Sequence, residues 1–215
     1  MDHPLIESIG RNFRVVLASG SPRRKELLDR LNLNYKVIPS NFAEDLDKSE
    51  FASAADYVKS NALIKAREVY ERIKDESDLP ALVIGSDTVV VSSGGEILEK
   101  PASLLDAAET LRGLSGKTNT VYTGICLIIG GTETGRVVVE EALEATEVTF
   151  NEMDDDMVNA YVATGEPMDK AGSYAYQSYA CFFVREIKGD FYTVVGFPCA
   201  RFYQMLRDLR RRGVI

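Results

Sequence analysis

The sequence predicts an α/β fold built around a mixed, twisted sheet. Short apolar runs of strand length alternate with stretches that carry an apolar stripe at helical spacing. The second half of the 215-residue chain holds two long apolar-rich segments separated by glycines, which is typical of a hairpin. No proline- or glycine-rich linker divides the chain, so we expect a single domain over residues 1–215, in which roughly 70 % of the surface of the unfolded chain is buried.

The first half of the chain predicts three strands and two helices. The first helix follows a strand and a small-residue loop, with Ser21 as a candidate N-cap and Pro22 at the favoured first helical position. In chain order, we expect a strand at 14–18, a helix from Ser21, a strand at 35–38, a helix at 53–74 and a strand at 81–85 that ends at Ser86, Asp87 and Thr88 and continues at 89–91.

The second half predicts further antiparallel strands and three helices. The Gly94-Gly95 turn returns the chain through a short strand, and the turn at Gly130-Gly131-Thr132, with Gly135, joins the two long strands. In chain order, we expect a strand at 97–98, a helix at 103–112, strands at 118–129 and 136–150, a helix at 153–163, strands at 181–187 and 192–195, and a closing helix at 198–211.

The composition excludes several classes of function. A net charge of −8 argues against a general nucleic-acid binder, although local cations can still hold a small anion. The only histidine, His3, is expected in a frayed terminus, so no Ser-His-Asp triad, Cys-His dyad or multi-histidine zinc site can be built. A bound metal should therefore be a hard cation with oxygen ligands.

The cysteines and the apolar segments bear on location. Cys126, Cys181 and Cys199 are scattered and form no CxxC pair, which indicates reduced, buried thiols and an intracellular protein. The first residues resemble no signal peptide. The longest apolar stretch, at 121–129, is too short to span a membrane.

The segment from Ser19 to Lys25 is a candidate phosphate site. A strand ends, a small-residue loop follows and a helix begins, so backbone N–H groups and the positive end of the helix dipole face whatever lies over the loop. Arg23 and Arg24 add guanidinium groups that grip phosphate oxygens in a bidentate way. The alternative is a capped surface helix with a solvated basic face.

Two charged residues stand out among apolar neighbours. Asp87 follows a buried strand, where α/β sheets place ligands, and could bind a metal or activate water; the alternative is an aspartate bonded to a turn. Lys65 falls on the apolar stripe of the 53–74 helix, so its ammonium group must snorkel to water, pair with an anion or face a cleft.

Two loops carry further candidates. Pro101 holds Lys100 extended beside Glu99, which is either a surface ion pair or a rigid lysine presented to phosphate. The polar loop at 165–178 contains Gln177, whose amide offers a donor and an acceptor together, as reading a base edge requires. Its alternative is a well-bonded connection.

The ordered set of these segments resembles the Maf family over nearly the whole chain. The matching segments are LASGSPRRKELL at 17–28, GSDTVV at 85–90, LEKP at 98–101, LSGKTNTVYTG at 114–124, GEPMDKAGSY at 165–174 and VVGFP at 194–198.

The resemblance implies a cytoplasmic, often dimeric enzyme that hydrolyses nucleoside triphosphates between the α and β phosphates with a divalent cation, Mg²⁺ or Mn²⁺. It implies an α/β fold similar to that of inosine triphosphate pyrophosphatases, with an elongated sheet and a central cleft. The single domain could form two lobes around this cleft. The family's catalytic aspartate falls on Asp87, and Glu44 with Asp87 is the expected metal pair. The expected substrate-binding residues are Ser19, Arg23, Arg24, Lys65, Thr88, Glu99, Lys100 and Gln177.

Arg23, Thr88 and Gln177 together resemble the subgroup that acts on dTTP and UTP. In that subgroup's reaction, Gln177 could pair with the O4/N3 edge of thymine or uracil. The subgroup usually reads YGIQG where this chain has residues 174–178, YAYQS. Ala175 and Ser178 take a positive φ less readily than glycine, and Tyr176 is larger than the usual aliphatic residue, so a reshaped base pocket is expected.

Three other functions remain open at this level. The first is a non-catalytic nucleotide sensor or regulator of cell division, the second is a nucleic-acid binder, which the net charge opposes, and the third is an enzyme for modified nucleotides. The expected mechanism is in-line attack of water on the α phosphorus, with Asp87 positioning or deprotonating the water. No partner other than the nucleotide and a second copy of the chain is expected.

Overall fold

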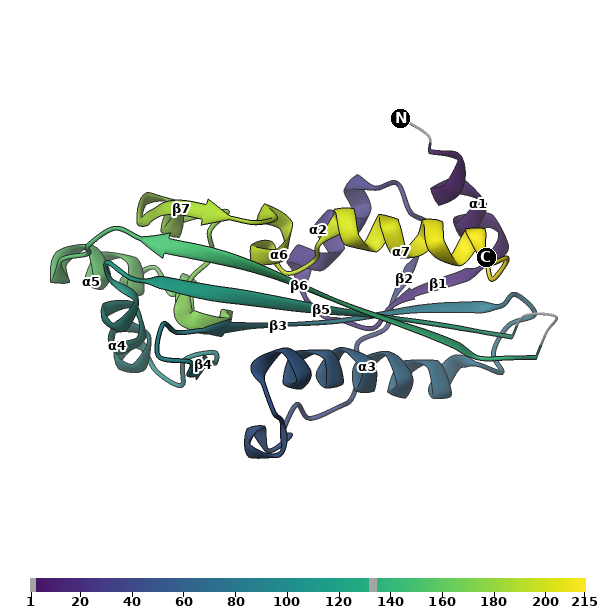
Figure 1. Ribbon diagram of the computed structural model, residues 1–215, viewed down its shortest axis with the longest axis horizontal. Coiled ribbons are helices and arrows are strands. Elements are labelled where there is room, and N and C mark those ends of the chain that lie inside the picture. The colour runs from purple at the N-terminus through teal and green to yellow at the C-terminus, as the bar shows by residue number, and fades with distance from the viewer. Residues whose placement is uncertain (1–2, 132–134) are drawn as a thin grey trace. The chain divides into compact units, whose positions relative to one another are not determined.

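The structure is a computed structural model that describes residues 3–131 and 135–215 (Figure 1). The chain forms two compact units. The first unit contains Met1–Asp87, Gly124–Leu143 and Gly196–Ile215, and the second contains Thr88–Thr123 and Glu144–Val195. In the described part of the chain, no helix is both long enough and apolar enough to cross a membrane.

A seven-stranded mixed sheet confirms the predicted α/β class. The strand order is β2-β1-β3-β5-β6-β7, with β4 paired to β3. The β1–β2 and β1–β3 pairs are parallel, whereas β3–β4 and β6–β7 are antiparallel. The strands are β1 Arg14–Leu17, β2 Lys36–Val37, β3 Ala81–Val91, β4 Ile97–Leu98, β5 Thr118–Gly130, β6 Val138–Phe150 and β7 Val184–Lys188.

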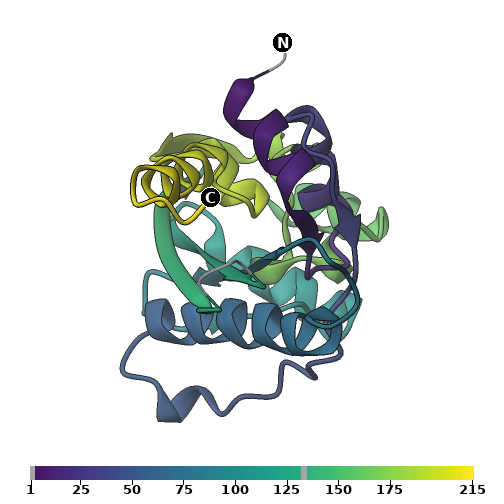
Figure 2. The ribbon, with the colours of Figure 1, turned by 90° about the vertical axis from the view of Figure 1, so that its right-hand side faces the viewer.

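In the first unit, helices cover both faces of the strands. Figures 1 and 2 show α3 on one face and α7 on the other, with α1 on the same side as α7. One apolar cluster joins α3 to the strands through small and β-branched side chains such as Ala62, Ala66, Val83 and Ile128. The helices of this unit are α1 Pro4–Asn12, α2 Pro22–Arg30, α3 Ala54–Ile73 and α7 Cys199–Arg211, with a 3₁₀ turn at Lys48–Glu50.

The second unit has its own apolar core, which includes Leu111, Val121, Phe150, Tyr161 and Phe183. Its helices α4 and α5 begin at the capping residues Ser103 and Asp154, whose side chains accept N–H groups of the first turn. The elements are α4 Leu104–Leu114, α5 Asp155–Ala163 and α6 Phe191–Val195, with 3₁₀ turns η2 Glu166–Asp169, η3 Ala171–Ser173 and η4 Tyr179–Phe182.

Most expected elements are present, but three predictions are wrong. Asp87 does not lie at the end of a strand, because β3 runs continuously from Ala81 to Val91 and contains it. The strand expected from Cys181 begins only at Val184, after a 3₁₀ turn. The segment 192–195 lies in a short helix, since the carboxylate of Asp190 accepts hydrogen bonds from both the N–H and the hydroxyl of Thr193 and so caps it.

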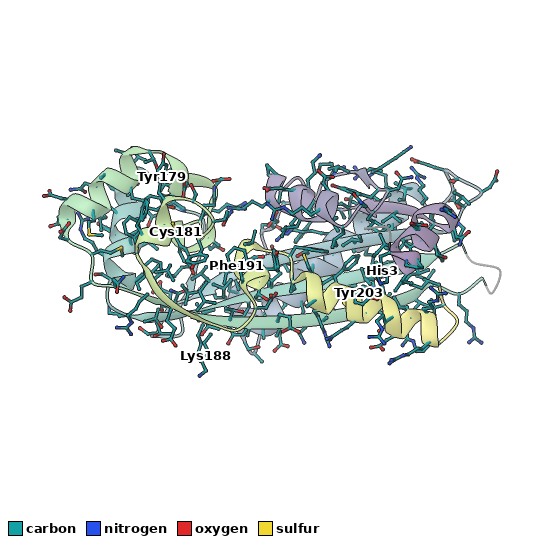
Figure 3. The ribbon with its side chains drawn as sticks, turned by 90° about the horizontal axis from the view of Figure 1, so that it is seen from above. His3, Tyr179, Cys181, Lys188, Phe191 and Tyr203 are labelled. Carbon is teal, nitrogen blue, oxygen red and sulfur yellow. The ribbon has the colours of Figure 1, made fainter. Side chains whose placement is uncertain are left out.

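The frayed terminus expected around His3 is also wrong. His3 is the N-cap of α1, and its Nδ1 accepts the N–H of Leu5 at 3.3 Å, while Nε2 lies 2.9 Å from the hydroxyl of Tyr203 on α7 (Figure 3). Leu5, Ile6 and Ile9 are buried and form the apolar face of this helix. The helix is only nine residues long, which is too short for this spacing to stand out in the sequence.

Two smaller expectations have separate outcomes. Cys126 is buried, and burial raises the pKa of its thiol to about 12, but Cys199 is half-buried and Cys181 exposed, so the prediction of uniformly buried thiols is wrong. The long strands β5 and β6 are hydrogen-bonded neighbours, as expected. Thr132 of the turn predicted between them lies outside the described residues.

Candidate active site

The position of the candidate site in the first unit follows from a close approach of α3 to β3. Gly85 faces the backbone of α3, and a Cβ atom there would lie 2.2 Å from the carbonyl oxygen of Ala62 and 2.8 Å from the Cβ of Ala66. Only glycine allows a helix backbone this close to the strand. Lys65 lies within the same stretch of α3, and Asp87 lies two residues after Gly85, on the same face of β3.

Lys65 connects two carboxylates in this region. Its Nζ lies 2.8 Å from Oδ1 of Asp87 and 2.7 Å from Oε2 of Glu44. The Lys65 and Asp87 side chains are only 8 % and 10 % exposed, whereas Glu44 is 47 % exposed. Of the alternatives for a lysine in an apolar stripe, the structure therefore selects pairing with anions.

Glu44 belongs to the long segment between β2 and α3 and has a left-handed backbone, with φ of 58°. This conformation is uncommon for a residue with a Cβ and is found where the surrounding structure or a function requires it. Here it accompanies a carboxylate that is about half exposed to solvent and pairs with the buried Lys65.

Arg24 on α2 is the second buried cation of this unit. Its Nη1 donates to Oγ of Ser19 at 3.0 Å and its Nε donates to the carbonyl oxygen of Gly196 at 2.9 Å. Burial lowers the pKa of Arg24, while the negative charges of Asp87 and Glu44 raise it and the charge of Arg23 lowers it. The guanidinium thus lies within electrostatic reach of both carboxylates that Lys65 pairs with.

The start of α2 is arranged differently from the expected cap. Ser21 is the N-cap residue, but its side chain makes no capping hydrogen bond, and its own N–H donates to Oγ of Ser19 at 3.3 Å. Pro22 follows at the first helical position, and Arg23 is half-buried beside Arg24. The first turn therefore keeps the helix-dipole character that favours an anion without a serine oxygen in its way.

The remaining predicted residues belong to the second unit. The hydroxyl of Thr88 lies 3.0 Å from that of Thr123, which donates to the carbonyl oxygen of Thr193 at 2.8 Å. Glu99 and Lys100 are exposed, and the Glu99 carbonyl accepts the N–H of Gly172 at 3.2 Å.

Gln177 is exposed at a turn. The structure thus brings Ser19 together with Arg24, and Lys65 together with both Glu44 and Asp87. Of the other five predicted residues, Arg23 lies on α2 in the first unit, and the second unit contains Thr88, Glu99, Lys100 and Gln177.

Three features of this region have no counterpart in the sequence predictions. The carbonyl of Gly196 accepts from both Arg24 and the hydroxyl of Ser86, at 2.9 and 3.4 Å. Gly196 has φ of 108°, and its place just before Phe197-Pro198 is the signal that could have marked it. Asn61, one helical turn before Lys65, is buried, and no hydrogen bond in the described part of the chain reaches its Oδ1.

Glu44 and Asp87 pass a chemical test for a divalent cation. Their oxygens are hard ligands, and both already face one cationic atom, the Nζ of Lys65. No group of three or more metal-ligating His, Cys, Asp or Glu side chains occurs among residues 3–131 and 135–215. Two carboxylates suit Mg²⁺ or Mn²⁺, because such ions take their other ligands from substrate phosphates and water.

Comparison with known proteins identifies the family. The family model described as "Maf-like protein" matches residues 14–209. The chain belongs to the Maf family. That match confirms the resemblance and covers every predicted site residue, from Ser19 to Gln177.

Among its Maf-family relatives, the chain is 46 % identical over 184 residues to a "dTTP/UTP pyrophosphatase" of Thermococcus kodakarensis, covering 86 % of this chain and 90 % of that protein. It is 41 % identical over 201 residues to a "dTTP/UTP pyrophosphatase" of Bacillus anthracis, covering 94 % and 96 %.

A human "Probable bifunctional dTTP/UTP pyrophosphatase/methyltransferase protein" is 43 % identical over 200 residues, which is 91 % of this chain but only 32 % of the human protein. The solved structure of the Staphylococcus aureus Ham1 protein aligns over 78 % of this chain and 89 % of that one with 14 % identity and a TM-score of 0.32, which is too low to carry a conclusion.

Replacing Lys65 by methionine is expected to lower the free energy of unfolding by about 3 kcal/mol, since the nearly buried Asp87 carboxylate would lose its cation. Lys59→Met is the matched control on the same helix, because Lys59 is 39 % exposed and pairs with Asp56 at 3.2 Å. The control should stay within about 0.5 kcal/mol of the parent protein. Urea unfolding measures the stability of both variants. Equal losses of stability would show that the ion pairs of Lys65 contribute no more than an exposed surface pair.

Proposed function

We propose that this chain is a metal-dependent nucleoside triphosphate pyrophosphatase that converts dTTP and UTP to the monophosphate and pyrophosphate. The observation that carries the proposal is the buried Lys65–Asp87 ion pair, with Glu44 and Arg24 beside it, in a chain of the Maf family. The names of the relatives from Thermococcus kodakarensis and Bacillus anthracis support the choice of substrates.

The proposed reaction is in-line attack of water on the α phosphorus. Asp87 accepts the proton of the attacking water and directs its oxygen, the α–β anhydride bond breaks, and pyrophosphate leaves with the bonding electrons. Arg24 and Lys65, with Arg23, are fixed cations that neutralise the charge gathering on the phosphate oxygens. Ser19 keeps Arg24 in place through the 3.0 Å hydrogen bond.

Glu44 and Asp87 are the proposed ligands of Mg²⁺ or Mn²⁺. When bound, such an ion polarises phosphate oxygens and lowers the pKa of a bound water. Lys65 contacts both carboxylates. When the ion binds, the ammonium group of Lys65 must therefore either share these carboxylates with the ion or turn toward the phosphates.

The roles proposed for the predicted residues of the second unit rest on the family resemblance alone. Lys100 is assigned to the phosphates, Glu99 and Thr88 to the nucleotide, and Gln177 to the base, where its amide pairs with the adjacent donor and acceptor of thymine or uracil. A homodimer and a cytoplasmic location remain predictions of the same origin.

The test is a panel of canonical nucleoside triphosphates with Mg²⁺ or Mn²⁺, in which pyrophosphate and orthophosphate are measured separately. We expect pyrophosphate from dTTP and UTP, and loss of activity with a chelator. Hydrolysis in ¹⁸O-labelled water should place the label in the monophosphate if water attacks the α phosphorus. Label in pyrophosphate, or orthophosphate as the first product, would contradict the mechanism.

The same panel separates the alternatives. Tight binding without turnover across all nucleotides and both metals would favour a non-catalytic regulator, for example of cell division. Turnover confined to nucleotides with modified bases would keep the reaction and change the substrate. Binding to DNA or RNA at low salt would support a nucleic-acid binder, which the net charge of −8 opposes.

A further inference from the structure

The turn that presents Gln177 is a compact unit of structure. The N–H of Ser178 donates to the carbonyl oxygen of Ala175 at 3.1 Å, which closes a four-residue β-turn with Tyr176 and Gln177 at its centre. Gln177 is exposed, while Ala175 is buried. The position of the Gln177 backbone, from which its side chain extends, therefore depends on how firmly residues 175 and 178 are held.

Both ends of this turn are tied to one pair of side chains. The N–H of Ala175 donates to the hydroxyl oxygen of Tyr161 at 3.1 Å, and the hydroxyl of Ser178 donates to Oε2 of Glu166 at 2.5 Å. The Tyr161 hydroxyl in turn donates to Oε1 of Glu166 at 2.7 Å. Tyr161, Glu166 and Ser178, which we call the turn clamp, thus form a closed ring of hydrogen bonds with the turn.

Two residues of the turn clamp, Tyr161 and Glu166, are held in place by their own contacts. Tyr161 lies on α5, is buried, and packs its ring edge-on against Phe183 at 5.2 Å. Burial and the hydrogen bond to Glu166 raise the pKa of Tyr161, so it remains a neutral donor. Glu166 follows Gly165, whose φ of 74° turns the chain, and its N–H donates to Oγ1 of Thr164 at 3.1 Å.

Ser178 is one of the positions at which this chain departs from the dTTP/UTP-type subgroup, which usually has glycine there. The φ of Ser178 is −128°, and Ala175 has no positive φ either, so neither position needs glycine. Glycine could not supply the hydroxyl that reaches Glu166. Ser178 was expected to reshape the base pocket. In the structure it instead adds a charge-assisted hydrogen bond to the turn that presents Gln177.

Tyr176 supports the turn from within the same unit. Its ring lies 5.5 Å from that of Phe191, at an interplanar angle of 67°. Phe191 is the first residue of α6 and is labelled in Figure 3. The larger aromatic residue is therefore accommodated by an edge-on contact, and the turn is held at positions 175, 176 and 178.

We propose that Tyr161, Glu166 and Ser178 are positioning residues that hold the Gln177 turn in the conformation that reads the pyrimidine edge. This inference rests on the proposed function, in which Gln177 contacts the base. A fixed amide distinguishes uracil from cytosine, whose donor and acceptor positions are exchanged, because the wrong base leaves polar groups unpaired. A loosened turn lets the amide adapt and loses that selectivity.

The test compares two replacements of Ser178 in the full chain. Ser178→Ala removes only the hydroxyl, and we expect KM for UTP to rise about tenfold, kcat to stay within about twofold, and the ratio of kcat/KM for UTP to that for CTP to fall about tenfold. Ser178→Thr, which keeps the hydroxyl, should keep the parent values. Unchanged KM and selectivity in Ser178→Ala would overturn the proposal.

Amide hydrogen exchange separates this inference from the proposed function. If the parent protein releases pyrophosphate from no nucleotide, the proposed function fails, and exchange then decides whether the clamp exists. Faster exchange of the Ala175 and Ser178 amides in Ser178→Ala than in Ser178→Thr would support the turn clamp. Equal exchange in the two variants would overturn it.

Discussion

Asp87→Asn is expected to lower kcat for dTTP and UTP by about 10³-fold while the protein stays folded. Asparagine keeps the size of the side chain and an oxygen for Lys65, but it cannot accept a proton from water or carry the charge that holds a divalent cation. Glu44 still pairs with Lys65, so no lone buried cation is left. The measurements are pyrophosphate release under saturating substrate and the thermal unfolding midpoint.

Asp208→Asn is the matched control for this prediction. Asp208 lies on α7 in the first unit, and its exposed carboxylate pairs with Arg211 one turn away at 3.3 Å. Its replacement removes the same charge from the chain and should leave kcat unchanged. An Asp87→Asn enzyme that kept the activity of this control would exclude Asp87 from the chemistry.

Gly85→Ala is expected to lower the free energy of unfolding by at least about 3 kcal/mol. The new Cβ would lie 2.2 Å from the carbonyl oxygen of Ala62 and 2.8 Å from the Cβ of Ala66, both on α3, and neither atom belongs to a flexible side chain. The helix must therefore move away from β3. Since α3 carries Lys65, the movement should also separate Lys65 from Asp87 and reduce turnover.

Gly113→Ala provides the control for adding the same methyl group. Gly113 lies within helix α4, and a Cβ there meets nothing within 4 Å. Alanine is preferred to glycine inside a helix, so this variant should be as stable as the parent or more stable by up to about 1 kcal/mol. Chemical denaturation measures the free energy of unfolding of both variants. Similar values would show that the close approach of α3 to Gly85 does not require glycine at this position.

Apolar spacing was enough to predict much of the secondary structure. The predicted helices at 53–74 and 103–112 begin at Ser53 and Ser103, and in the structure these serines are the N-caps of α3 and α4. The segment 192–195 shows the limit of such reasoning. Its β-branched residues favour a strand, and the capping bonds from Asp190 outweigh that preference.

Helix α1 was missed for a similar reason. Its N-cap is a histidine, an unusual cap, and its apolar face is complete only against the rest of the first unit, where His3 contacts Tyr203, some 200 residues away in sequence. No local pattern contains that contact.

The sequence by itself determined the α/β class, the candidate cations and carboxylates, and the likeness to one family, because these depend on residue type, order and short-range periodicity. Only the tertiary structure decided that the amine of Lys65 meets both Asp87 and Glu44, that Arg24 is held by Ser19 and Gly196, and that Ser178 reaches Glu166. These contacts join residues far apart along the chain, and their distances are set by how closely helices and strands pack. At Gly85, that spacing depends on the absence of a single methyl group.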